Sequence, residues 1–311
     1  MLESKVIGFA SSDRLGAIRI IVVLCAILNV VFQDFTLLGQ AVGPWYQPEG
    51  FFRAIPAHWT GIFFNSEAVL LIFKAFLLIF LISALIGFYT RFSLLVSTGF
   101  YAFYLATLGS GAGSLDCGVL PLYLMFMLIW IPSGEGISLD PWRRRRREYA
   151  HLKLDDRPSV SIGWSVFLLR AVLAFSFFQA GLSKIQNTGW GWIRPWRLEQ
   201  FFIQDSLVFS HAGWVSHLIA VPPPFWMLLA MAYLGIELFF PVILLVRNSR
   251  VLYLLAAVLV RSFVLIPQNI FFHDLILLQF IFYHWDRILP LGPASEHDRR
   301  KGTPFFRIPK V

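Results

Sequence analysis

The sequence FFQAGLSKIQNTGWGW, from Phe177 to Trp192, ends a long apolar stretch with one lysine and a tryptophan-rich bend. The apolar residues that precede Lys184 are numerous enough to cross a bilayer as a helix, which takes roughly twenty residues. A lone ammonium at the end of such a segment is either an interface anchor or a functional group. The stretch therefore predicts a transmembrane helix with Lys184 as its candidate functional residue.

The rest of the chain has the same apolar character. Of its 311 residues, 57% are hydrophobic and only 14% are charged, and its mean hydropathy is +0.68. Because so few charged side chains cannot provide a normal polar surface, we predict an all-α integral membrane protein. The net charge of +8 could suggest nucleic acid, but the basic run Arg143–Arg147 lies between apolar stretches. We therefore expect membrane lipids, and no nucleic acid, as partners.

The apolar runs predict a helical bundle of about eight transmembrane spans in one domain over 10–290, followed by a short basic tail over 291–311. We place the spans near 15–33, 68–88, 93–108, 117–132, 163–183, 223–246, 251–265 and 270–284. With both termini cytoplasmic, 18 of the 26 lysines and arginines fall on the cytoplasmic side, as the positive-inside rule requires. The sequence lacks an Asn-x-Ser/Thr sequon, which favours a bacterial inner membrane. In this topology Lys184 faces the outer, periplasmic side.

Two segments between the predicted spans are rich in aromatic residues and lie on the outer side. The first covers about 34–67 and the second covers 190–221, where Trp190 and Trp192 begin a series of large rings. The second segment is expected to lie in the interface as a short amphipathic helix. Together the two segments are expected to roof an outward-facing cavity.

Lys184 shares one helical face with Arg170, Phe177 and Gly181, because these residues lie at offsets of 7, 11 and 14 from Arg170. The small residue Gly181 would let another helix approach closely beside the lysine. In one interpretation Lys184 extends to the lipid headgroups beside the tryptophans. In the other it is a general base, since an amine that loses its hydration in an apolar pocket becomes a better proton acceptor.

Glu237 is the only acidic residue well inside an apolar run. Because an unpaired buried carboxylate is very costly, structural pairing with Arg170 or Arg261 is the favoured role. Arg19 and Lys74 are also interpreted as structural.

Asp116 and Cys117 begin the fourth predicted span at the level of Lys184, and His273 lies near the outer end of the eighth. Cys117 is either a small buried hydrophobe or a reactive thiolate, and His273 either a core histidine or an oriented imidazole. No ligand spacing in the sequence predicts a metal.

Several short motifs, in this order, resemble the HTTM family, the transmembrane part of the vitamin K-dependent gamma-glutamyl carboxylases and their bacterial relatives. The resemblance covers roughly 10–290. It rests on Arg14-Leu-Gly-Ala-Ile-Arg19, Gly87-Phe-Tyr-Thr-Arg91, Ile137-Ser-Leu-Asp140, Phe178-Gln-Ala-Gly-Leu-Ser-Lys184 with Gly189-Trp190, and Glu237 thirteen residues before Arg250.

The resemblance implies that Lys184 is the base that deprotonates a reduced, vitamin K-like quinone. Cys117 stands where the carboxylases have an assisting histidine, and Arg261 stands where they have a later histidine. The chain ends soon after the last predicted span, so the outer domain that holds a protein substrate is expected to be absent. Carboxylation of a protein is therefore not expected.

These residues and the resemblance together predict two alternative functions. The first is a quinone-dependent oxidase, epoxidase or carboxylase-like membrane enzyme. In that enzyme Lys184 would be the base, Asp116 and Cys117 would assist it, and the cofactor would contact Gly181, Trp190, Trp192, Glu237, Arg261 and His273. The alternative is a non-catalytic membrane partner, such as a maturation or immunity factor for a secreted peptide or protein.

Overall fold

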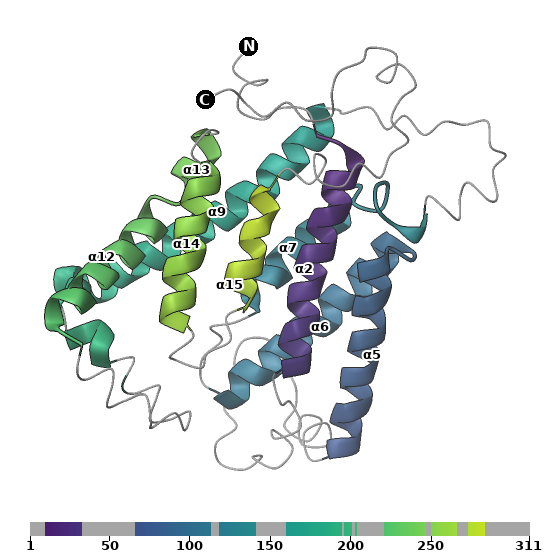
Figure 1. Ribbon diagram of the computed structural model, residues 1–311. Helices are drawn as coiled ribbons and strands as arrows, with labels where there is room; N and C mark the ends of the chain where they lie inside the picture. Colours follow the sequence, from purple (N-terminus) through teal and green to yellow (C-terminus); the bar gives the residue numbers. More distant parts are fainter. Residues whose placement is uncertain are drawn as a thin grey trace, which may run out of the picture.

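The computed structural model of the chain describes residues 10–32, 66–112, 118–140, 160–194, 196–200, 203, 221–246, 250–265 and 273–283. Within these ranges the protein is all-helical, with about ten helices (Figure 1). The longer helices are α2 (Ser12–Phe32), α5 (Glu67–Ile86), α6 (Thr90–Ala112), α7 (Val119–Trp130), α9 (Val160–Thr188), α12 (Pro223–Leu238) and α14 (Arg250–Leu265). Shorter elements are η3 (Gly189–Ile193), α13 (Val242–Leu245), α15 (His273–Leu277) and η4 (Leu278–Phe282). Helices thus occupy all eight predicted stretches.

Three helical segments in the described ranges are both long enough and apolar enough to cross a membrane. They are Ser12–Phe32, Glu67–Ile86 and Val160–Ile193. The outward face of α5 is itself apolar, since Ile72, Phe76 and Ile79 are all exposed. A helix that presents large aliphatic and aromatic side chains on its outer face is suited to lipid and poorly suited to water.

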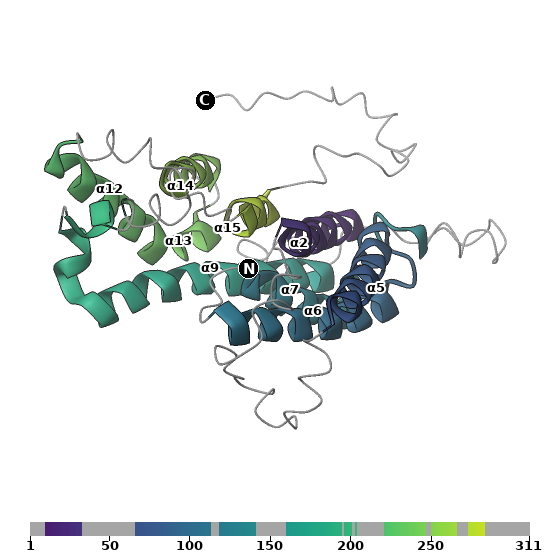
Figure 2. The same ribbon diagram turned by 90° about the horizontal axis from the view of Figure 1, so that it is seen from below.

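The helices form two groups joined by α9. Helices α2, α5, α6 and α7 pack together, whereas α12 and α13 pack against α9, and α14 packs on α12 (Figure 1). Seen from below, α9 runs beneath α2 and extends away from it to meet α12 (Figure 2). Elements α15 and η4 pack against α2, so the end of the described chain lies between the two groups.

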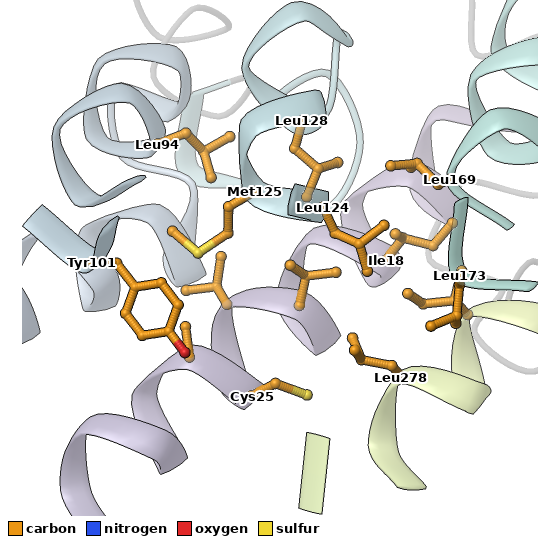
Figure 3. Packing of buried hydrophobic residues seen from close by; sticks show 14 of the residues in the cluster. Ile18, Cys25, Leu94, Tyr101, Leu124, Met125, Leu128, Leu169, Leu173 and Leu278 are labelled. Atoms are coloured by element: carbon orange, nitrogen blue, oxygen red, sulfur yellow. The ribbon is translucent and has the colours of Figure 1, made fainter. Parts of the chain in front are cut away.

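The main core lies where α2 meets α6, α7, α9 and η4. Ile18 and Cys25 of α2 belong to this cluster together with Leu124 and Met125 of α7, and the Cys25 side chain points toward Leu278 of η4 (Figure 3). These side chains are fully buried, and the same cluster includes Leu169 and Leu173 of α9, so it fixes the position of the middle of that helix. The far end of α9, which carries Lys184, is free to pack against α12.

The predicted single span over 223–246 is interrupted in the structure. Helix α12 ends at Leu238, and a turn over Phe239, Phe240 and Pro241 precedes α13. Proline has no N–H and its ring clashes with the preceding helical turn, so Pro241 cannot continue α12. The turn places Phe240 in the core beside Phe177, with ring centroids 4.5 Å apart.

Candidate functional site

Lys184 and Glu237 form an ion pair between α9 and α12. The Lys184 Nζ lies 2.8 Å from Oε1 and 2.7 Å from Oε2 of Glu237. The Glu237 side chain is only 4% exposed, whereas that of Lys184 is 21% exposed. The ammonium therefore contacts a nearly buried carboxylate through both oxygens, the arrangement in which a buried charge pair is best satisfied.

The ion pair depends on a close approach of the two helices at Gly181. A Cβ atom at Gly181 would lie 2.9 Å from the Glu237 Cβ and 3.2 Å from the backbone nitrogen of Leu238. Both distances are shorter than an ordinary van der Waals contact. The predicted role of Gly181, a small residue that admits a neighbouring helix, is confirmed, and the neighbour is α12.

Two aromatic rings lie beside the Lys184 ammonium. The Nζ atom is 5.5 Å from the centroid of the Trp192 ring and 5.1 Å from that of Tyr233. Both distances are within the range of cation–π attraction. Trp192 reaches this position through η3, which directly follows α9. Trp190, the other predicted tryptophan, is 73% exposed and so lies largely on the surface.

Arg261 of α14 is a second cation at this helix junction and is only 1% exposed. Its Cζ lies 3.7 Å from the centroid of Phe177 and 5.5 Å from that of Phe240. Glu237 and Tyr233 act electrostatically on the guanidinium, the tyrosine through its hydroxyl group. Beyond this contact with the Tyr233 hydroxyl, the Arg261 nitrogens make no well-aligned hydrogen bond in the described part of the chain.

Arg170 does not neutralise Glu237, although the sequence made it a candidate. Its guanidinium instead donates three hydrogen bonds, each 3.1 Å long, to the carbonyl oxygens of Ile281, Phe282 and Tyr283. These carbonyls end η4, where no further helical N–H follows to bond them. Arg170 and Lys184 share one face of α9, as predicted, but serve different partners.

A second buried polar cluster lies among α2, α6, α7 and α15. The backbone N–H of Gly118 donates to Oδ2 of Asp274 at 3.0 Å, and the Asn29 side-chain amide donates to the Tyr101 hydroxyl at 3.0 Å. Asp116, Cys117 and the His273 side chain lie outside the described residues. Their neighbours Gly118 and Asp274 belong to this second cluster, and these hydrogen bonds do not connect it to Lys184.

Three of the motifs that carry the HTTM resemblance meet at one junction. Arg19 donates to the carbonyl oxygens of Leu85, Ser133 and Ile137. Asp140 accepts hydrogen bonds from the N–H groups of Tyr89 and Thr90, at the beginning of α6, and from the Thr90 hydroxyl. The interpretation of Arg19 as structural is confirmed, and the junction ties together α2, α5, α6 and the segment after α7.

No protein-family model, no curated protein and no solved structure matches the chain. Membership of the HTTM family therefore stays a prediction. Among the described residues no group of three or more histidine, cysteine, aspartate or glutamate side chains could hold a metal ion.

Tyr233 and Phe240 are site residues that the sequence alone did not reveal. Tyr233 lies on the same face of α12 as Glu237, because it precedes Glu237 by four residues, whereas Phe240 lies in the turn that follows α12. The spacing of Tyr233 was a signal in the sequence, and the position of Phe240 was not. The choice of α12 as the partner of α9 was not, because several apolar helices offered similar faces.

Proposed function

We propose that the protein is a membrane-embedded enzyme of the HTTM type that binds a quinone-like, membrane-soluble ring and moves a proton at Lys184. The observation that carries this proposal is the Lys184–Glu237 ion pair, which lies next to the rings of Trp192 and Tyr233. Aromatic side chains favour a flat apolar ligand, and a buried pair of titratable groups is a common feature of sites that transfer protons.

The pair gives Lys184 a way to act as a base. In the charged pair the ammonium cannot accept a proton, but its proton can pass to Glu237 along the 2.7 Å hydrogen bond. The resulting amine can then take a proton from a ligand hydroxyl, which leaves the ligand as an anion beside the regenerated ammonium. Low polarity around the pair lowers the cost of the neutral state relative to the charged one.

We further propose that the chain crosses a bacterial inner membrane about eight times, with both termini in the cytoplasm and the ion pair towards the periplasmic half. The three long apolar helices and the exposed apolar face of α5 support a membrane location. The distribution of lysine and arginine supports the orientation. Reporter fusions after each predicted span test the topology, and an active cytoplasmic reporter placed at Gly189 would contradict it.

The first test is mass spectrometry of small molecules that co-purify with the wild-type protein and with Lys184→Ala in nanodiscs of native lipid. A stoichiometric quinone in the wild type that is lost in the variant supports the proposal. Oxygen-dependent epoxidation of added reduced quinone is then measured for both proteins. If both carry only bulk phospholipid and neither consumes the quinol, the proposed enzyme is wrong.

One observation favours a non-catalytic membrane partner as the second candidate. Glu237 satisfies Lys184 through both carboxylate oxygens, so the pair is complete without any ligand. A purely structural pair can be replaced by two apolar residues of similar size with little loss. Lys184→Met combined with Glu237→Met should therefore preserve the cellular function of a partner protein and abolish that of the enzyme.

A further inference from the structure

We propose that Arg261 is the recognition group for an oxyanion, a carboxylate or a ring-bound hydroxylate, on an apolar ligand that binds between α9, α12 and α14. This inference deepens the proposed function and rests on it for the ring-shaped body of the ligand. The oxyanion itself follows from Arg261 and its surroundings.

The hydrogen bonding of Arg261 differs from that of two other buried arginines. Arg19 and Arg170 each donate hydrogen bonds to three main-chain carbonyl oxygens. The Nε, Nη1 and Nη2 atoms of Arg261 are buried and make no well-aligned hydrogen bond within the described residues, where the Tyr233 hydroxyl is a hydrogen-bonding neighbour. A guanidinium carries five N–H donors in one plane, and buried donors nearly always have acceptors. One hydroxyl oxygen cannot satisfy five donors, so the structure provides a cation and leaves most of its donors to be satisfied from elsewhere.

The guanidinium packs by its face, so this contact does not use its buried N–H donors. Its Cζ lies 3.7 Å from the centroid of the Phe177 ring, a stacking distance, and 5.5 Å from that of Phe240. A guanidinium stacked on a ring is held by its face, while its N–H groups point outward in its plane. This presentation suits an anion that approaches the edge with two oxygens, as a carboxylate does.

The charges at the junction also favour an anionic ligand. Lys184 and Arg261 bring two positive charges, and Glu237 brings one negative charge that Lys184 already engages through both oxygens. The described cluster is therefore positive overall. A ligand with one negative charge would neutralise it and would accept hydrogen bonds that Glu237 cannot accept while it is bound to the lysine.

The test compares acids with neutral amides of the same shape, for protein in phosphatidylcholine nanodiscs. Binding of 2-naphthoate and 2-naphthamide is measured by calorimetry and by the shift in Tm. We expect the wild type to bind the naphthoate about tenfold more tightly or better, because charge-assisted hydrogen bonds exceed neutral ones. Arg261→Met should remove this preference, and Arg261→Lys should retain only part of it. Equal binding of 2-naphthoate and 2-naphthamide by the wild type would exclude an oxyanion on a ring-shaped ligand, and the acyl-chain probes below then decide whether the oxyanion site itself is wrong.

Arg170→Met is the matched control, since it removes a buried arginine whose donors are satisfied. We expect it to lower the Tm of the ligand-free protein and to keep the preference for the acid. Arg261→Met should leave the ligand-free Tm unchanged or higher, because it removes a charge with unmet donors. A loss of Tm as large as that of Arg170→Met would show that Arg261 is structural and would also overturn the inference.

A second pair of probes separates this inference from the proposed function. Oleate and oleamide carry the same head groups on an acyl chain instead of a ring. Preference for oleate that depends on Arg261, without preference for naphthoate, supports the oxyanion site and contradicts the ring-binding enzyme. If neither acid binds better than its amide, the oxyanion site is wrong, whatever the outcome of the quinone assays.

Discussion

The Lys184 ammonium lies 2.7 Å and 2.8 Å from the two carboxylate oxygens of Glu237, although the residues are 53 positions apart in the chain. This contact joins the far end of α9 to α12. Lys184, whose place in the sequence resembled that of an interface anchor, is therefore one member of a partly buried ion pair. The pair suggests how a proton could move at the site.

Replacing only Lys184 should destabilise the protein more than replacing both Lys184 and Glu237. Lys184→Met leaves Glu237 buried without its partner, and we expect a loss of about 3 kcal/mol in the free energy of unfolding. The double variant Lys184→Met/Glu237→Met should recover most of that loss, because no uncompensated charge remains. The measurement is a double-mutant cycle of reversible unfolding in mixed micelles. Arg91→Met, at an exposed position, is the control and should change stability by less than about 0.5 kcal/mol. Additive single effects would show that the pair is not coupled.

Helices α9 and α12 approach so closely at Gly181 that a side chain at this position should destabilise the protein. Gly181→Ala places a methyl group 2.9 Å from the Glu237 Cβ, so α9 and α12 must move apart. We expect a loss of about 1–3 kcal/mol, the usual cost of overpacking, measured as a lower Tm.

Gly235→Ala on α12 is the matched control for this substitution, since its Cβ would meet nothing within 4 Å. It should be neutral or stabilising by up to about 1 kcal/mol, because alanine favours the helix. Similar Tm values for the two variants would contradict the assigned packing of α9 on α12.

Gly87 lies at the junction that contains Arg19 and Asp140, and a side chain at this position should destabilise the protein. This glycine has a φ of +74° and caps α5, and a Cβ there would collide with the Ser138 side chain and lie 2.9 Å from Arg19 Nη2. Gly87→Ala should therefore cost about 2 kcal/mol or more, from strain and steric overlap together. Gly189→Ala, at a φ of +58° with open space around it, should cost only about 1 kcal/mol. The ratio of folded to aggregated protein on size-exclusion chromatography ranks the two, and the reverse order would contradict the junction.

Asp274 should be needed as an acceptor and not as a charge. Its Oδ2 accepts the Gly118 N–H at 3.0 Å, and the side chain is buried. Asp274→Asn keeps a carbonyl oxygen for the Gly118 N–H but loses the Oδ1 acceptor of the Leu275 N–H, so it should cost less than Asp274→Leu. The leucine leaves both N–H groups without this acceptor and should cost about 2 kcal/mol or more. Hydrogen exchange at Gly118 is the readout. Fast exchange in the Asn variant as well would show that the negative charge itself is required.

Several features of the fold could be predicted from the sequence because they depend on local chemistry. Apolar runs of sufficient length predicted helices in all eight stretches, and three of the resulting segments are long and apolar enough to cross a membrane. Spacing along one helix predicted the shared face of Arg170, Phe177, Gly181 and Lys184. Proline at position 241 could also have predicted the break after α12, because its missing N–H acts wherever the residue stands.

Sequence by itself thus determined the helices, their apolar faces and the few charged residues that an apolar interior must satisfy. Tertiary structure alone decided which charge meets which partner. Lys184 meets Glu237, Arg170 meets the last carbonyls of η4, and Arg261 stacks on Phe177. Helix formation depends on neighbours three or four residues away, whereas these pairings depend on how whole helices pack. Many apolar faces are similar, so the pairing is fixed only where small residues such as Gly181 let two of them approach.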